Sequence, residues 1–172
     1  MPDINFAALL FLGFIILQRL TELAIAKRNT KRLLERGAKE HGAGHYPAIV
    51  ALHSAWIAAL IVLGIDQALS LPWLAFFIVL QALRVWILTS LGDRWTTRII
   101  ILDEPLVRAG PFRFLRHPNY VLVVAEIIAA PMVLGLVWVA AIFTLLNAII
   151  LYVRISAEEA ALAPLRQPDH KE

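Results

Sequence analysis

Long apolar runs constrain this chain more than any other feature of its sequence. Ile4–Ala26, Pro47–Leu69 and Leu71–Leu91 are each long enough to cross the ~30 Å hydrocarbon core of a bilayer as a helix. Hydrophobic residues make up 60% of the chain, whereas a soluble domain of this size is nearer half apolar. The sequence therefore predicts that residues 1–172 form one integral membrane domain, with three spans in residues 1–91.

A fourth apolar region follows a polar stretch and is interrupted by Pro131. Asn119–Ala130 is too short to cross a membrane alone, whereas Met132–Val153 is long enough. Proline lacks a backbone donor, so we expect a turn or kink at Pro131 within a helical hairpin. The predicted fold is an all-α, polytopic bundle of five membrane helices, in which residues 92–162 supply a loop, the hairpin and a tail.

Basic residues outside the predicted spans all lie on one side of this arrangement. The chain has 16 lysines and arginines, of which only Arg19 and Arg84 lie within spans; the others follow the first, third and last spans. By the positive-inside rule the N-terminus is outside and the C-terminus cytoplasmic, in the inner (cytoplasmic) membrane if the source is bacterial. The same pattern accounts for the pI of about 9.6, so we expect no nucleic-acid partner. The chain has no cysteine, and its five histidines show no metal-ligand spacing, so no metal site is predicted.

Polar side chains at a similar depth lie inside all five predicted helices. They are found about 6–11 Å from the cytoplasmic helix ends, at Arg19, Glu22, His53, Arg84, Glu126 and Asn147. Ionisable groups at such depth usually face the interior of a bundle and pair with one another. A purely structural interpretation stays open, since Arg19 and Glu22 could pair on one helix, Arg84 could snorkel and His53 could be a core histidine. Their common depth favours a water-accessible cavity that opens to the cytoplasm.

Two polar segments flank the predicted hairpin. GPFRFLRHPNY, residues 110–120, stands where the polar loop enters the fourth apolar region, and RISAEEAAL, residues 154–162, follows the last span. Arginine and histidine suit a ligand carboxylate, glutamate suits an ammonium or hydroxyl group, and proline stiffens a binding loop. On these residues alone, the arginines could be topological anchors and the HPNY run a helix start.

Together the two segments resemble the C-terminal half of the isoprenylcysteine carboxyl methyltransferase (ICMT) family of integral membrane methyltransferases. The family pattern Gly-x-aromatic-x-x-x-Arg-His-Pro-x-Tyr is matched by Gly110, Phe112, Arg116, His117, Pro118 and Tyr120. The pattern Arg-x-x-x-Glu-Glu-x-x-Leu is matched by Arg154, Glu158, Glu159 and Leu162. The resemblance covers roughly residues 91–162, and LGDRWTTRII and HYPAIVALHSAW resemble small bacterial members associated with type III polyketide synthases. Members of that group are identified as enzymes that O-methylate long-chain alkylpyrones or alkylresorcinols.

The resemblance implies S-adenosyl-L-methionine as cofactor and methyl donor, bound on the cytoplasmic side. The implied cofactor-binding residues are Glu104, Leu106, Val107, Phe112, His117, Pro118, Asn119, Tyr120 and Glu158. Arg154 is the implied catalytic residue, which would orient the acceptor. The chain departs from the family at Val121 and Leu122, where many members have glycine, and at Phe112, where tyrosine is usual. We therefore expect Phe112 to stack on the cofactor without a hydrogen bond.

The polar layer and Arg154 predict where an acceptor binds, and the substrate-binding candidates are Arg154, His53, Arg84 and Glu126. The expected acceptor is a lipophilic small molecule whose apolar tail enters sideways from the membrane lipid. A phenol or enol needs a base, which His53 or Glu126 could supply, whereas a carboxylate or acidic hydroxypyrone needs none. The sequence predicts neither the oligomeric state nor the role of Glu159.

Three other functions stay open at this point. A phospholipid N-methyltransferase would share much of the same C-terminal pattern. A sterol-type membrane reductase that uses NADPH shares the Pro-Asn-Tyr segment, but it usually has an acid where Leu122 and Val123 stand. A non-catalytic small transporter or assembly subunit would need polar groups across the midplane, and only Gln81 and Thr144 lie deeper than the polar layer.

Overall fold

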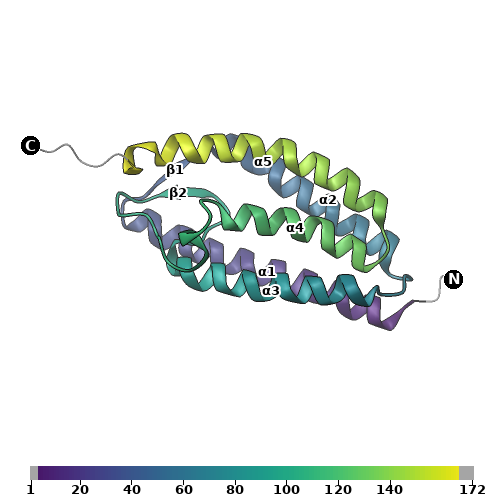
Figure 1. Cartoon of the computed structure of the whole chain (residues 1–172). Coiled ribbons are helices and arrows are strands. Elements are labelled where there is room, and N and C mark those ends of the chain that lie inside the picture. Colours follow the sequence, from purple (N-terminus) through teal and green to yellow (C-terminus); the bar gives the residue numbers. More distant parts are fainter. Residues whose placement is uncertain (1–3, 167–172) are drawn as a thin grey trace, which may run out of the picture.

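The computed structural model describes residues 4–166, which form five helices, with a small sheet made by strands from the α1–α2 and α3–α4 connections (Figure 1). The helices are α1 (Phe6–Glu35), α2 (Tyr46–Gly64), α3 (Leu71–Leu91), α4 (Pro118–Val133) and α5 (Val137–Arg166). The strands are β1 (Lys39–His41) and β2 (Ile99–Ile101), and three 3₁₀ turns are η1 (Ala43–His45), η2 (Gly92–Arg94) and η3 (Gly110–Arg113). The predicted all-α fold class with five helices is confirmed.

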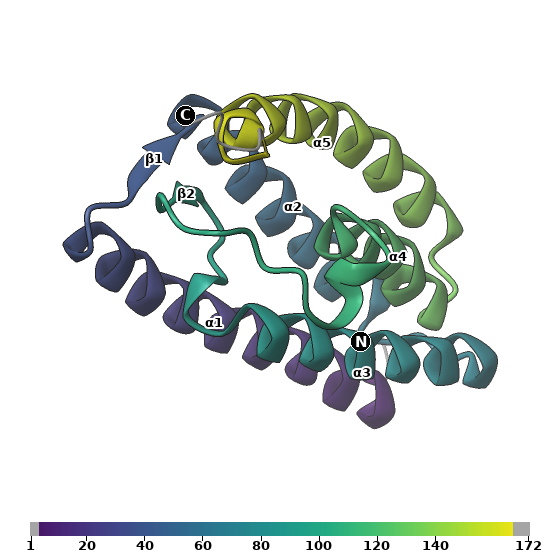
Figure 2. The ribbon, with the colours of Figure 1, turned by 60° about the vertical axis from the view of Figure 1, so that its left-hand side comes forward.

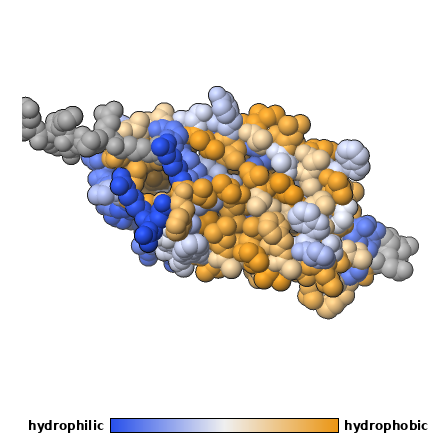
Figure 3. All heavy atoms as spheres, viewed as in Figure 1, coloured by the Kyte–Doolittle hydropathy of each residue, from blue (hydrophilic) through white to orange (hydrophobic). Residues whose placement is uncertain are grey.

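Four of the helical segments within residues 4–166 are long and apolar enough to cross a membrane, which indicates a multi-pass membrane protein. They are Phe6–Glu35, Ala43–Gly64, Leu71–Arg94 and Val137–Leu165. The fifth helix, α4, has 16 residues and spans about 24 Å, less than a ~30 Å hydrocarbon core. Hydrophobic side chains cover most of the face in Figure 3, while hydrophilic ones gather around a hollow at the end that carries β1 and β2.

The hairpin between α4 and α5 turns at Gly135, not at Pro131 as the sequence predicted. Pro131 lies inside α4, which continues to Val133. Gly135 adopts a φ of 69°, in the left-handed region that glycine enters without a steric penalty, and its N–H donates to the Met132 carbonyl at 3.2 Å. The missing N–H of Pro131 removes one hydrogen bond near the helix end, whereas the reversal of the chain needs the left-handed residue.

Two helices extend beyond the apolar runs that predicted them. α1 continues past Ala26 to Glu35, and α5 continues past Val153 to Arg166, so the predicted tail is a continuation of the last helix. Conversely, α2 ends at Gly64, before the predicted Leu69. Hydropathy marks where a helix leaves the apolar medium, whereas residues such as lysine, arginine, leucine and glutamate continue the helix in water.

A two-stranded antiparallel sheet, which the sequence analysis did not predict, lies at the polar end of the bundle. β1 pairs with β2 in the register Lys39↔Ile101 to His41↔Ile99. Next to it, the buried Asn29 amide of α1 donates to the Trp95 carbonyl at 2.9 Å and to the Gly92 carbonyl at 3.3 Å. These bonds hold the segment between α3 and β2 against α1.

The short helix α4 is central to the packing and lies between α3 and α5 (Figure 2). Its Ala129 and Ala130 are fully buried, and small residues of this kind let membrane helices approach closely. α1 contacts the bundle through aromatic packing, with the Phe11 and Phe77 ring centroids 5.2 Å apart in an edge-to-face arrangement. In this arrangement the first turn of α4 faces the middle of α5. The two polar segments therefore lie next to each other.

Candidate active site

The side chains of the two polar segments form one connected cluster. Arg154 and Glu158 are four residues apart and share one face of α5, opposite Tyr120 in the first turn of α4. The Tyr120 hydroxyl donates to the Glu158 carboxylate and accepts from Arg154 Nε at 2.9 Å. The His117 ring stacks on Tyr120 with centroids 5.4 Å apart and pairs through Nε2 with Glu159. The structure therefore brings together residues that are far apart in the sequence.

The turn that leads into this cluster depends on Gly110. Its φ is 55°, and a Cβ there would overlap the hydroxyl of Ser90 on α3. Only glycine combines this backbone conformation with such close approach. Pro118 then starts α4, and a proline at the first helical position has no N–H left unpaired. The glycine and the proline of the first segment thus fix where His117 and Tyr120 lie.

A first cavity, here called the loop cavity, lies at the polar end of the bundle. Its walls come from the segment between α3 and β2, from the 110–120 segment and from α5. The lining residues are Leu91, Arg94, Trp95, Thr96, Arg98, Ile99, Ile100, Ile101, Phe112, Arg116, His117, Asn119, Tyr120, Arg154, Glu158 and Leu162. It combines an apolar wall with arginine, histidine and glutamate side chains.

A second cavity, here called the bundle cavity, lies between the helices. All five helices contribute to its lining, which consists of Arg19, Glu22, Leu23, Tyr46, Ile49, Val50, His53, Ser54, Ile57, Arg84, Trp95, Thr96, Thr97, Asn119, Tyr120, Val123, Asn147, Ile150, Leu151 and Arg154. Five residues line both cavities, namely Trp95, Thr96, Asn119, Tyr120 and Arg154. The two cavities therefore share a wall, and ligands bound in them would meet at Tyr120 and Arg154.

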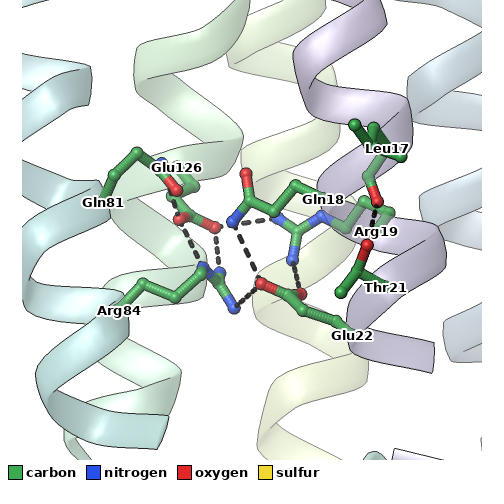
Figure 4. Close-up of polar contacts among 8 residues, drawn as sticks. All are labelled: Leu17, Gln18, Arg19, Thr21, Glu22, Gln81, Arg84 and Glu126. Carbon is green, nitrogen blue, oxygen red and sulfur yellow. Dashed lines mark hydrogen bonds and ion pairs between the residues drawn. The ribbon is translucent and has the colours of Figure 1, made fainter. Parts of the chain in front are cut away.

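Figure 4 shows a buried ion-pair network. Three of its members, Arg19, Glu22 and Arg84, line the bundle cavity. Arg84 donates through Nε to Glu126 at 2.7 Å, and its Nη1 lies 3.1 Å from Glu22. Arg19 bridges the same two carboxylates at 2.9 Å and 2.8 Å. The side chains of Arg84 and Glu126 are only 4% and 1% exposed, so each charge needs these partners. The network ties α1 to α3 and α4.

The predicted substrate-binding residues lie at different places around the bundle cavity. His53, Arg84 and Arg154 line it, and so does Asn147 of the predicted polar layer. Glu126 is not among the lining residues, because it lies behind Arg84 and accepts hydrogen bonds from Arg84 and Arg19. Of the four candidates, Glu126 is the one that does not line the bundle cavity.

The predicted cofactor-binding residues divide into two groups. Five of them line the loop cavity, namely Phe112, His117, Asn119, Tyr120 and Glu158. Pro118 is buried in the first turn of α4 and lines neither cavity. Leu106 and Val107 also line neither, and Glu104 pairs with Arg36 at 2.6 Å and with Arg94. Among residues 4–166, Glu104 is therefore connected to the loop cavity through Arg94, which lines it.

Several cavity residues were not among the predicted site residues, and Trp95 is the most informative of them. Trp95 lines both cavities and is 5% exposed, yet its indole Nε1 has no hydrogen-bond partner within residues 4–166. The side-chain oxygen of Asn119, Oδ1, is unpaired in the same part of the chain. Buried polar atoms are normally paired, so an unpaired donor and acceptor in a shared wall suit a ligand. The polar run WTTR, which follows η2, is the sequence feature that could have indicated it.

Comparison with known proteins shows which protein family and which bacterial proteins the chain is similar to. The sequence model of the isoprenylcysteine carboxyl methyltransferase (ICMT) family matches residues 73–164, which include both polar segments. The chain is 36% identical over 159 residues to the uncharacterized protein YpbQ of Bacillus subtilis (strain 168), covering 89% of this chain and 95% of that protein. It is 30% identical over 170 residues to an uncharacterized protein of Haemophilus influenzae, covering 95% of each. No solved structure matches the chain significantly.

Proposed function

The chain belongs to the isoprenylcysteine carboxyl methyltransferase (ICMT) family, and we propose that it is an S-adenosylmethionine-dependent membrane methyltransferase. The acceptor in this proposal is lipophilic and is methylated at the cytoplasmic face of the membrane. The observation that supports it is the shared wall of the two cavities, which contains Tyr120 and Arg154. One cavity suits a polar methyl donor, and the other is bounded by membrane helices.

The loop cavity suits S-adenosylmethionine by the chemistry of its side chains. Glu158 can accept from the ribose hydroxyls or the ammonium group, and Arg116 can pair with the carboxylate. Phe112 and the isoleucines of β2 offer apolar surface to the adenine ring, and the unpaired Trp95 Nε1 is a donor for it. When bound, this cofactor supplies an electrophilic methyl group on a sulfonium. The protein's contribution is then mainly to position the reactants and exclude water.

The charges around the bundle cavity favour an oxygen acceptor. The charges of Arg19 and Arg84 are balanced by Glu22 and Glu126, whereas the cation Arg154 lines the cavity outside that network and donates to the Tyr120 hydroxyl. A cation stabilises a bound carboxylate or ionised hydroxyl and disfavours the binding of an ammonium group. The acceptor class is therefore a carboxylate or acidic hydroxyl on an apolar tail, of the isoprenylcysteine, alkylpyrone or alkylresorcinol kind.

The apolar part of the bundle cavity lies next to the lipid-facing surface. Leu23 of α1 and Val50 of α2 line the cavity and are 48% and 45% exposed. The cavity wall is thus continuous with the outer surface between these two helices. A lipophilic acceptor would enter sideways there, with its tail in the membrane and its polar group toward Arg154.

Replacement of the two α5 residues tests the site. Arg154→Ala and Glu158→Ala in purified protein should abolish methyl transfer while the helical circular dichroism spectrum stays unchanged, because each removes a side chain from the cavities and not from the core. Arg28→Ala, at an exposed position of α1, is the matched control and should keep full activity. Full activity in both α5 variants would remove the site assignment.

Identification of the methylated product tests the acceptor. Membranes are incubated with labelled S-adenosylmethionine and extracted lipids, and the product is then analysed by mass spectrometry. A methylated lipid carboxylate or hydroxyl supports the proposal, whereas methylated phosphatidylethanolamine would make the protein a phospholipid N-methyltransferase. A protein that binds NADPH but not labelled S-adenosylmethionine would be a reductase, and one that binds neither would be a transporter or assembly subunit.

A further inference from the structure

The histidine of the bundle cavity has a fixed tautomer. His53 lies on α2, and its Nδ1 is 2.9 Å from the backbone carbonyl oxygen of Ile49, one helical turn earlier. A carbonyl oxygen can only accept, so Nδ1 carries the hydrogen. In a neutral imidazole the other ring nitrogen, Nε2, then has a lone pair that can accept a proton.

Nε2 of His53 is available to a ligand. The ring lines the bundle cavity, and within the described chain no side chain or backbone group is hydrogen-bonded to Nε2. His117 provides a contrast, since its Nε2 pairs with Glu159. The bundle cavity therefore contains an oriented imidazole whose basic nitrogen has no competing partner among residues 4–166.

The other groups that could take a proton there are already engaged. Glu126 accepts four hydrogen bonds: Oε1 from Gln81 and Arg84, and Oε2 from Arg19 and Arg84 (Figure 4). These occupy the four lone-pair sites of a carboxylate. Glu22 is held by Arg19 and Arg84 in the same network.

The two tyrosines that line the bundle cavity are engaged as well. The Tyr120 hydroxyl donates its hydrogen to Glu158, and the Tyr46 hydroxyl is hydrogen-bonded to Thr97 at 3.1 Å. The geometry therefore distinguishes His53 from the second candidate base of the sequence analysis, Glu126.

We propose that His53 is the general base of the methyl transfer and that the acceptor carries a hydroxyl group, a phenol or an enol. This inference rests on the proposed function. Nε2 forms a bond to the hydroxyl proton as the O–H bond breaks, and the bonding electron pair stays on the oxygen. The oxygen would then form a bond to the methyl carbon as the carbon–sulfur bond of the methyl donor breaks, and that electron pair would leave with the sulfur as a neutral thioether. The imidazolium then releases its proton to water at the cytoplasmic end.

The charged groups around His53 act on the acceptor oxygen. Arg19 and Glu22 on α1, Arg84 on α3 and Arg154 on α5 line the same cavity as His53, and Glu126 on α4 lies behind Arg84. Arg19 and Arg84 are paired with the two carboxylates, so Arg154 is the cation that stabilises the oxygen anion as it forms. A carboxylate acceptor would need no base, so the presence of an oriented base narrows the acceptor class to hydroxyls that are protonated at neutral pH.

The experiment compares two acceptors that differ in their need for a base. Wild type, His53→Gln and His53→Ala are tested with a long-chain 5-alkylresorcinol and with a long-chain 4-alkyl-2-nitrophenol, which is already ionised at slightly alkaline pH. Loss of a general base should lower kcat for the resorcinol by about 10²–10³-fold in both variants and leave kcat for the nitrophenol within about threefold. His41→Gln, on β1 and outside both cavities, is the matched control and should behave as wild type.

Two further measurements do not depend on turnover. Binding of labelled S-adenosylmethionine should be unchanged in the His53 variants. The ¹⁵N spectrum of histidine-labelled protein should contain a nonprotonated Nε2 signal that is absent in His53→Gln, and a protonated Nε2 at His53 would contradict the assigned tautomer.

The outcomes separate failure of this inference from failure of the proposed function. If the variants methylate the resorcinol at the wild-type rate, or lose both acceptors equally, His53 is not the base even though the protein is a methyltransferase. If wild type binds the methyl donor but methylates neither phenol, the hydroxyl acceptor class is wrong. If wild type does not bind S-adenosylmethionine, the proposed function itself fails.

Discussion

At the scale of single residues, Tyr120 keeps two opposite charges apart. Arg154 and Glu158 are one turn apart on α5, at a spacing that commonly produces a direct ion pair. Here the Tyr120 hydroxyl lies between them, accepting from one and donating to the other, and the Arg154 guanidinium carbon also lies 5.6 Å from the Tyr120 ring centroid. Under the proposed function, Glu158 would contact the methyl donor in the loop cavity, and Arg154, which lines both cavities, would contact the acceptor.

The buried network makes a stability prediction at the same scale. Glu126→Gln removes the negative charge between Arg84 and Arg19 and leaves buried cations with one carboxylate, that of Glu22. Removal of one partner from a buried ion pair costs about 3–5 kcal/mol, because the remaining charge stays buried. We expect the free energy of unfolding in mixed detergent micelles, followed by tryptophan fluorescence, to fall by about that amount.

The control for Glu126→Gln is an ion pair on the surface. Glu35→Gln breaks the contact with Lys31 at 3.9 Å, where the side chains are 62% and 80% exposed. Exposed pairs of this kind contribute about 0–1 kcal/mol. Equal and small losses in both variants would show that the network does not hold α1 to α3 and α4.

At the scale of elements, the α4–α5 hairpin depends on one glycine. Gly135→Ala adds a Cβ that meets no atom within 4 Å, so its effect is conformational: φ is +69°, which alanine adopts at a penalty of about 1–2 kcal/mol. We expect a loss of unfolding free energy of that size. The measurement is again unfolding in mixed micelles.

Gly13→Ala in α1 is the matched control for the hairpin glycine. Gly13 also has open space around its added Cβ, but it lies within a regular helix. Alanine is favoured over glycine there by about 0.8–1 kcal/mol, so this variant should be as stable as wild type or more stable. A loss of stability in both variants would mean that the added methyl, and not the backbone conformation, is responsible.

At the scale of the whole molecule, the distribution of charge predicts the orientation in the membrane. The chain has no cysteine, so single cysteines can be introduced without a background. Ala68→Cys, at an exposed position between α2 and α3, should react with an impermeant maleimide in intact cells. Lys31→Cys, at an 80% exposed side chain of α1, should react only after the membrane is permeabilised, because the positive-inside rule predicts that the basic end is cytoplasmic.

The opposite labelling pattern would show that the orientation is reversed and that the polar end of the bundle lies outside the cell. Both cavities lie toward that end, so the methyl donor would then have no access to the loop cavity from the cytoplasm. Labelling of both positions in intact cells would instead indicate a mixed orientation.

Much of the architecture follows from local properties of the sequence. The apolar runs predicted the spans of α1, α2 and α3, because hydropathy over about 20 residues reports on the medium around a helix. The helical rise placed Arg19, His53 and Arg84 at one depth. The spacing within RISAEEAAL put Arg154 and Glu158 on one face of a helix.

Other features depended on the path of the chain between the helices. The turn lies at Gly135 and not at Pro131, since reversal of the chain requires a left-handed residue. Glu104 pairs with arginines outside the loop cavity, whereas Trp95 enters the shared wall because Asn29 holds the adjacent backbone. Neither contact leaves a periodic pattern in the sequence.

The sequence by itself determined that this protein is a bundle of membrane helices with polar groups at one level and two polar segments around a hairpin. Only the tertiary structure decided that Tyr120 separates Arg154 from Glu158, that Glu126 is saturated by the network and that Nε2 of His53 faces no competing partner among residues 4–166. Depth and spacing are properties of each helix alone. The choice of partner depends on how neighbouring helices are rotated about their axes, and that is set by packing between them.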